Sequence, residues 1–374
     1  MVILKILEIV LAAGAVQGFF LALILTAKST RKKTSSKLLA ALLIVLSVSI
    51  LHSLLAGPGF DSPYKIREPF ILFIGPLLNF YVYELTGSRK IAWKDILHFL
   101  PFVLLILFLM PAWASIPSPY ATFLFQNGPT ISTVIWALIV LQYGYYWWNT
   151  VSVLHEHRIA VESEFSNIEG KTLSWLGFFL HLFGGFLLVL VLTLVIAFHS
   201  DRYDIIDTIV CLGLSCTIFI LGYNGLFQEE VFSITTSQNE TDRREKDRQP
   251  RPPRTDVQPS ARNDESLKKL KAYLEKKKPY LNETLTLTEL AGQIGMTRNQ
   301  LSFLINSAYG ENFYSFINRY RVEEVKRLIA DPKKLNFTIL SLAYEAGFPS
   351  KSSFHSVFKK LTGLTPTEYR KKLQ

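Results

Sequence analysis

Cysteine is nearly absent from this sequence of 374 residues, which contains only two. Cys211 and Cys216 both lie inside a long apolar run. Their number and spacing exclude a disulfide framework and match no pattern of metal-ligating cysteines. We interpret both as small packing residues, and we expect no metal to be bound there.

The sequence also lacks the motifs that carry the chemistry of common enzyme classes. It contains no phosphate-binding loop, no HExxH, no nucleophile elbow and no paired Cys/His ligands. The nearest candidate for a metal site is LHEHRIA, in which His155 and His157 flank Glu156 without a further ligand nearby. We interpret these residues as part of a solvated loop. We expect a protein that is not an enzyme and needs no cofactor.

Charge is scarce in the first part of the chain, where residues 1–227 hold 14 Lys/Arg and 12 Asp/Glu. Residues 228–265 hold 7 against 9, and residues 266–374 hold 19 against 9. Most of the net charge of +10 therefore belongs to the C-terminal part. A small domain this basic suggests a polyanionic partner, although a solvated basic surface explains the charge equally well.

Long apolar runs fill the first 227 residues. A membrane-spanning helix needs about 20 mostly apolar residues. The stretches that qualify are 3–27, 38–57, 69–86, 96–115, 129–149, 172–199 and 205–227. They predict a seven-helix transmembrane sensor domain over 1–227, embedded in a lipid bilayer. The sequence does not indicate which small-molecule or membrane signal this domain senses.

The basic residues between these runs predict an orientation. Loops 28–37, 88–95 and 150–171 hold 5, 3 and 2 Lys/Arg, ten in all, and the loops on the other side hold three. Cytoplasmic loops carry the excess of Lys and Arg. We expect the N-terminus outside and everything after the seventh run in the cytoplasm, where DNA is available.

Residues 228–265 predict a linker. The stretch 237–265 is charged, contains proline and has almost no large apolar residue. Such a composition cannot bury a core, so we expect a flexible tether.

The domain over 266–374 opens with an expected helix at 266–281, followed by two short helices around Gly295. Thr286 or Thr288 can cap the first and Thr297 the second, and glycine suits the left-handed residue between them. This is the helix-turn-helix arrangement. The expected buried residues are Leu287, Leu290, Ala291, Ile294, Leu301, Leu304, Ile305 and Ala308.

A long amphipathic helix over 313–330 separates this pair from a second one. Residues 338–348 repeat the threonine cap and the glycine, here Gly347, and 349–363 form the next helix. A last helix over 365–373 begins near Pro366, which suits a helix start. The second pair is expected to bury Ile339, Leu342, Ala343, Phe354, Val357, Phe358 and Leu361.

The second helix of such a motif enters the major groove of double-stranded DNA and contacts bases from its N-terminal residues. Arg and Asn match the edges of guanine and adenine. Phe303 fits a thymine methyl group, or alternatively packs against a neighbouring helix. The candidate DNA-binding residues are Arg298, Asn299, Ser302, Phe303 and Asn306 in the first motif and Lys351, Ser352, Ser353, Ser356 and Lys359 in the second.

Residues 266–373 resemble the DNA-binding domain of the AraC/XylS family of transcriptional regulators. The resemblance rests on LAYEAGFPSKSSFHSVFKKLTGLTPTEYRK in the second half and on LTELAGQIGMTRNQLSFLI in the first. It implies base contacts through Asn299, Ser302 and Phe303, and through Lys351, Ser352 and Ser356. Many members have arginine at the positions of Phe303 and Ser356. That difference concerns the strength or base choice of the contacts rather than the fold.

Together the two parts predict an all-α, membrane-embedded transcriptional regulator. The architecture is similar to that of membrane-anchored family members from bacteria, which implies a multi-pass protein of the bacterial cytoplasmic membrane. A homodimer is compatible with such a regulator, because paired sites raise effective concentration. The alternatives are a receptor or transporter-like protein whose C-terminal domain binds a protein partner, and a factor that acts only after proteolytic release.

Overall fold

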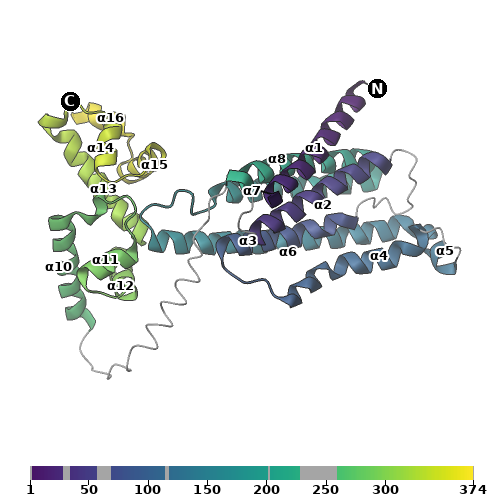
Figure 1. Ribbon diagram of the computed structural model, residues 1–374, viewed down its shortest axis with the longest axis horizontal. Helices are drawn as coiled ribbons and strands as arrows, with labels where there is room; N and C mark the ends of the chain where they lie inside the picture. Colours follow the sequence, from purple (N-terminus) through teal and green to yellow (C-terminus); the bar gives the residue numbers. More distant parts are fainter. Residues whose placement is uncertain are drawn as a thin grey trace. The chain divides into compact units, whose positions relative to one another are not determined.

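The computed structural model describes residues 2–27, 34–56, 69–113, 118–200, 203–227 and 259–373. Within these ranges every regular element is a helix, and the one β-type contact is an isolated bridge between Phe165 and Thr286. The all-α class predicted from the sequence is confirmed for this part of the chain. The chain divides into two compact units, Met1–His155 with Leu173–Thr236 and Glu156–Thr172 with Ser237–Gln374 (Figure 1).

The first unit consists of helices that follow the apolar stretches in order. Its elements are α1 (Val2–Ala27), α2 (Thr34–Ala56), η1 (Pro69–Phe73), α3 (Ile74–Thr86), η2 (Trp93–Phe99), α4 (Leu100–Trp113), α5 (Pro119–Gln126), most of α6 (Gly128–Glu164), α7 (Ser174–Ser200) and α8 (Tyr203–Phe227). The sequence does not predict the short helix α5, whose N-cap Ser118 accepts a hydrogen bond from the Ala121 N–H.

Helix α2 lies at the centre of this unit, packed against α1, α3 and α8. Its Leu42, Leu43 and Leu46 are completely buried. Helix α1 approaches α8 closely at Gly14, where a Cβ atom would lie 2.7 Å from the Ser215 hydroxyl oxygen. Small residues at helix contacts allow such approach, and they are enriched between membrane helices.

Four of the seven predicted spans meet the length and hydropathy needed to cross a membrane, among the residues that the structure describes. They are Glu8–Ala27, Thr34–Leu54, Pro69–Thr86 and Trp93–Pro111. The apolar stretches Ser174–Val189 of α7 and Ile209–Gly225 of α8 are shorter than these four. The fifth predicted span, 129–149, lies within α6, which continues as a helix to Glu164.

The second unit contains the end of α6 and a set of short helices built around α13. Its further elements are α10 (Pro259–Lys277), η3 (Pro279–Leu281), α11 (Leu287–Ile294), α12 (Arg298–Tyr309), α13 (Phe313–Ala330), η4 (Pro332–Lys334), α14 (Ile339–Glu345), α15 (Lys351–Thr362) and α16 (Pro366–Leu373). Residues 228–258 of the predicted linker lie outside the described residues. Helix α10 begins at Pro259, earlier than the predicted start at 266, since proline is tolerated in a first helical turn.

Helix α13 serves two separate hydrophobic cores. Its first half contributes Phe313, Phe316 and Ile317 to a core shared with α10, α11 and α12. Its second half contributes Val325 and Leu328, with neighbouring residues, to a core shared with α14 and α15. One helix therefore fixes the geometry between two helix pairs.

Candidate nucleic-acid interface

The first helix pair, α11 and α12, is set by caps that the sequence specifies. Thr286 and Glu289 form a reciprocal capping box at the start of α11, with bonds of 3.1 Å and 2.9 Å. Gly295 then adopts a left-handed conformation, with φ of 71°, and Thr297 caps α12 together with Gln300. In each cap, side-chain oxygen atoms accept hydrogen bonds from backbone N–H groups that a helix start leaves unpaired. The first turn of α12 is therefore held in place from its own sequence.

The second pair, α14 and α15, repeats this construction. Thr338 caps α14, and Ser350 caps α15 by accepting from the Ser353 N–H. Gly347 lies between them with φ of 89°. A Cβ atom at Gly347 would lie 2.7 Å from the carbonyl oxygen of Leu281, so the turn fits against η3 only with glycine.

The predicted DNA-binding residues lie on the faces of α12 and α15 that point away from the two cores. On α12 the side chains of Asn299, Phe303 and Asn306 are exposed, and those of Arg298 and Ser302 are partly exposed. On α15 the exposed residues are Lys351, Ser352, Ser356 and Lys359, and Ser353 is partly exposed. All ten residues are therefore on surfaces of the second unit.

The structure decides whether Phe303 packs against a neighbouring helix. Its side chain is 63% exposed, so the alternative that it packs against a neighbouring helix is wrong.

Two residues expected in the cores lie outside them. Ala308 is exposed, and Leu361 is 42% exposed. Both are in the last turn of their helices, where Gly310 and Gly363 turn the chain away from the core.

Arg321 of α13 is a central residue that the sequence does not single out. It is completely buried, and its five N–H groups donate to protein oxygen atoms. The acceptors are the carbonyl oxygens of Tyr280, Asn282 and Ser166, the Ser166 hydroxyl and the Asn318 side chain. Burial lowers the pKa of Arg321 to about 10.

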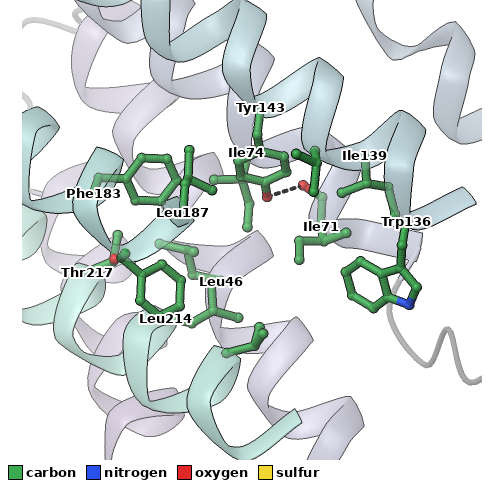
Figure 2. A pocket seen from close by; sticks show the side chains of 13 residues that line it. Leu46, Ile71, Ile74, Trp136, Ile139, Tyr143, Phe183, Leu187, Leu214 and Thr217 are labelled. Carbon is green, nitrogen blue, oxygen red and sulfur yellow. Dashed lines mark hydrogen bonds between the residues drawn. The ribbon is translucent and has the colours of Figure 1, made fainter. Parts of the chain in front are cut away.

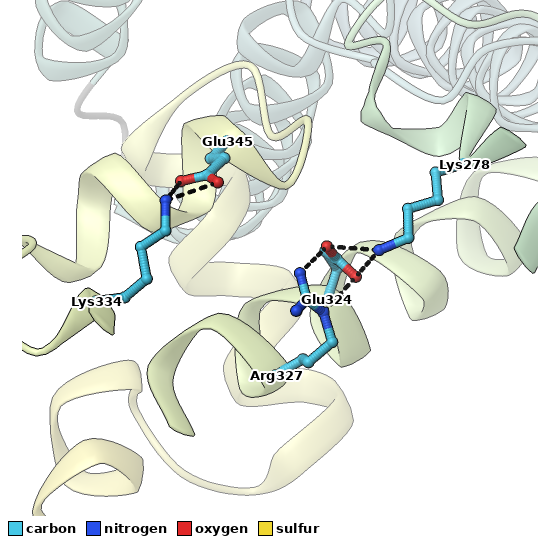
Figure 3. Close-up of polar contacts among 5 residues, drawn as sticks. All are labelled: Lys278, Glu324, Arg327, Lys334 and Glu345. Carbon is cyan, nitrogen blue, oxygen red and sulfur yellow. Dashed lines mark hydrogen bonds and ion pairs between the residues drawn. The ribbon is translucent and has the colours of Figure 1, made fainter. Parts of the chain in front are cut away.

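Ion pairs join the parts of the second unit at two further points (Figure 3). The carboxylate of Glu324, 8% exposed, lies between Lys278 and Arg327, at 3.0 Å and 2.7 Å. Hydrogen bonds from Arg327 and Lys278 lower the pKa of Glu324. Lys334 pairs with Glu345 at 2.8 Å.

Two candidate DNA-binding residues already have acidic partners within the second unit. Arg298 Nε lies 2.7 Å from Glu164 Oε2. The Ser352 hydroxyl donates to Glu169 Oε1 at 2.9 Å. Neither glutamate is indicated by the sequence, where both fall in the expected solvated loop.

The interpretation of His157 as part of a solvated loop is wrong. The residue lies in α6, its side chain is 6% exposed, and its Nε2 atom is 2.8 Å from the carbonyl oxygen of Lys171. Burial lowers the pKa of His157, and the hydrogen bond to Lys171 partly opposes this. Among the described residues no group of three or more His, Cys, Asp or Glu side chains is arranged to hold a metal ion.

The first unit contains a small cavity of about 30 Å³ between η1, α2, α3, α6, α7 and α8 (Figure 2). The polar side-chain atoms of its lining residues belong to Trp136, Tyr143 and Thr217. The Tyr143 hydroxyl donates to Ile71 O at 2.8 Å, and the Thr217 hydroxyl donates to Gly213 O at 2.8 Å.

Comparison with known proteins finds similarity in the C-terminal part of the chain. Residues 290–372 match the family described as a helix-turn-helix domain. An uncharacterized HTH-type transcriptional regulator of Staphylococcus aureus strain COL is 33% identical over 108 residues, 29% of this chain and 14% of that protein. The melibiose operon regulatory protein of Escherichia coli K12 is 30% identical over 90 residues, 24% of this chain and 29% of that protein.

A solved structure of a protein of unknown function from Listeria innocua is also similar, at 27% identity and a TM-score of 0.25. It covers 29% of this chain and 97% of that chain. The sequence relatives support the resemblance to AraC-type regulators for the C-terminal part. This chain spans only 14% and 29% of the length of the two relatives named.

Proposed function

We propose that this chain is a membrane-embedded transcriptional regulator that binds promoter DNA sequence-specifically through two helix-turn-helix motifs. In this proposal it is not an enzyme, and its output is controlled by a signal that the first unit senses. The observation that carries the proposal is the repeated construction of α11–α12 and α14–α15 around one rigid helix, with polar residues on the outer faces of α12 and α15.

The spacing of the two pairs fits a bipartite site. Helix α12 starts at Arg298 and α15 at Lys351, and α13 contributes to the cores of both halves. Two recognition helices on one rigid spacer can reach successive major grooves, about 34 Å apart on one face of DNA. A single chain can then read two half-sites, and a homodimer would double them.

The outer faces have the chemistry for DNA. Asn299 matches the edge of adenine, and Lys351 and Lys359 match backbone phosphates or guanine. The exposed Phe303 supplies an apolar surface for a thymine methyl group. These residues would give one base-reading face on each helix.

The first unit supports the membrane part of the proposal. Large apolar side chains such as Leu107, Leu141 and Phe178 are 63%, 69% and 72% exposed. Exposing apolar surface to water costs about 25 cal/mol per Å², a cost that lipid removes. With the excess of basic residues in loops 28–37, 88–95 and 150–171, we propose a cytoplasmic membrane protein with its N-terminus outside and its second unit in the cytoplasm.

The test uses the full chain in lipid nanodiscs and a pool of random-sequence duplexes. We expect selection to enrich one bipartite motif. Asn299→Ala should weaken binding by about 1–3 kcal/mol and relax one position of the motif. Lys359→Ala should weaken binding to all duplexes. It should also reduce the slope of log affinity against log salt concentration by about 1.

Lys90→Ala is the matched control, because this exposed lysine belongs to the first unit. It should leave affinity and salt dependence unchanged. The proposal fails if no motif is enriched, or if Asn299→Ala binds like Lys90→Ala.

A further inference from the structure

The segment 156–172 is packed into the second unit through Ser166. The Ser166 N–H donates to Leu285 O at 3.1 Å, and its hydroxyl donates to the same oxygen at 2.7 Å. Phe165 forms the isolated bridge with Thr286. Ser166 is only 1% exposed, so the segment is part of the packed unit.

Helix α13 holds the same serine at the junction of the two halves. Arg321 Nη1 and Nη2 donate to the Ser166 carbonyl and hydroxyl oxygens at 3.1 Å and 3.0 Å. Asn318 Nδ2 also donates to the Ser166 carbonyl oxygen, at 3.4 Å. The segment therefore reaches both helix pairs from one anchoring point.

Glu164 occupies the first helix pair. Its Oε1 atom accepts from the Thr288 N–H at 3.2 Å and from the Thr288 hydroxyl at 2.7 Å. Its Oε2 atom accepts from Arg298 Nε at 2.7 Å. One carboxylate thus joins the first turn of α11 to the first residue of α12.

Glu169 occupies the second helix pair in the same way. Its Oε1 atom accepts from the hydroxyls of Ser350, the N-cap of α15, and of Ser352 in its first turn. A third carboxylate, Glu162, accepts from Asn312, the N-cap of α13, at 3.0 Å. The segment therefore places an acidic side chain at the start of each of these helices.

These contacts have the chemistry of phosphate recognition. Carboxylate and phosphate oxygens both accept from arginine, from hydroxyls and from the backbone N–H groups of helix starts. Arg298 and Ser352 belong to the candidate DNA-binding residues, and each donates to a glutamate of the segment. A donor held by a carboxylate is not free to bind a phosphate or a base.

We propose that segment 156–172 competes with DNA for both helix pairs, so that high-affinity DNA binding requires its release; this rests on the proposed function of those residues. The segment follows the predicted span 129–149 in the chain and precedes the span 172–199. A signal that changes these helices can therefore reach the DNA-binding residues through the segment itself, without any contribution from residues 228–258.

The test compares variants of the full chain in nanodiscs. Glu164→Gln combined with Glu169→Gln removes the two charges and keeps the shape of the side chains. The control is Glu156→Gln, an exposed glutamate of the same segment. The probe is one fluorescent duplex, whose sequence is selected from a random pool both by the wild-type chain and by the double variant.

We expect the double variant to bind the duplex about tenfold more tightly than the wild type. This factor corresponds to a wild-type chain in which the segment is released in about one tenth of the molecules, because only those molecules bind DNA with full affinity. Glu156→Gln should bind like the wild type. Equal affinity of the double variant and Glu156→Gln would overturn the competition while leaving DNA binding established. If no form enriches any duplex, the proposed function itself fails, and the competition with it.

Hydrogen exchange gives a second readout that does not depend on the variants. The Ser166 N–H is protected by its bond to Leu285, so a peptide covering 165–172 should exchange slowly in the free wild-type chain. A saturating concentration of the duplex should make it exchange faster. Unchanged protection with DNA bound would identify the segment as a permanent part of the domain and refute competition.

Discussion

Replacement of Arg321 by methionine tests the account of how the second unit is held together. Methionine has a similar length but no donor, so the carbonyl oxygens of Tyr280, Asn282 and Ser166 lose their arginine partner. A buried polar group left without a partner costs about 1–3 kcal/mol. The guanidinium is itself buried unfavourably, as its pKa of about 10 indicates, and removing it offsets part of that cost.

We therefore expect Arg321→Met to lower the free energy of opening of α13 by about 1–3 kcal/mol after that offset, because buried carbonyl oxygens are left without their arginine partner. The control is Arg327→Met on the same helix. Arg327 is 57% exposed, and its partner Glu324 keeps its bond to Lys278. We expect Arg327→Met to cost about 1 kcal/mol or less, because the Arg327 guanidinium is mostly exposed and the buried carboxylate of Glu324 is not left unpaired.

The assay is hydrogen exchange of α13 peptides in the full-length protein, which reports the free energy of local opening. Equal destabilisation by the two substitutions would refute the reasoning, since the buried network of Arg321 would then contribute no more than the half-exposed Arg327–Glu324 pair.

The remaining predictions concern a turn and a histidine. Gly347→Ala should destabilise the second helix pair by more than Gly295→Ala destabilises the first. Both glycines are left-handed, but only at Gly347 would the added Cβ atom lie within 3 Å of backbone oxygens. Thermal unfolding of the two variants measures the difference, and equal destabilisation by both would contradict the prediction. Burial lowers the pKa of His157 below its ordinary value of 6.5, so the unfolded segment binds the proton more tightly, and stability present above pH 6.5 is lost as pH falls below it. Hydrogen exchange of the 165–172 peptide, corrected for intrinsic rates, should therefore become faster as pH falls from about 7.5 to about 5.5, and by more in the wild type than in His157→Gln. The same acceleration in both proteins would exclude His157 as the cause of the lost stability.

Much of the second unit could be predicted because its helices carry their signals locally. The caps at Thr286, Thr297 and Thr338 and the glycines at 295 and 347 mark helix ends in the sequence, and the structure has helix ends there. The apolar faces between these ends follow the helical period, which places the opposite faces outward.

Errors arose where a local pattern does not determine the surroundings. The apolar period extends to Ala308 and Leu361, but the core ends before the last turn of each helix. The sequence also does not predict the end of α6, because its apolar residues indicate a span that ends near residue 149, whereas the helix continues through polar residues to Glu164.

The docked segment could not be found from the sequence at all. Glutamates at the end of a helix are typical of a solvated surface, and nothing near Glu164 or Glu169 indicates a partner. The contacts of Ser166 with Leu285 and of Glu169 with Ser352 join residues 119 and 183 positions apart. Only the folded structure brings such residues together.

The most direct test of the central proposal is chromatin immunoprecipitation with sequencing of the tagged full-length protein, kept in its membrane. We predict a few sharp peaks that share a bipartite motif, which Asn299→Ala and Lys351→Ala each weaken in one half. An intact, membrane-bound protein with no enrichment over an untagged control would contradict the proposal that this chain regulates transcription from the membrane.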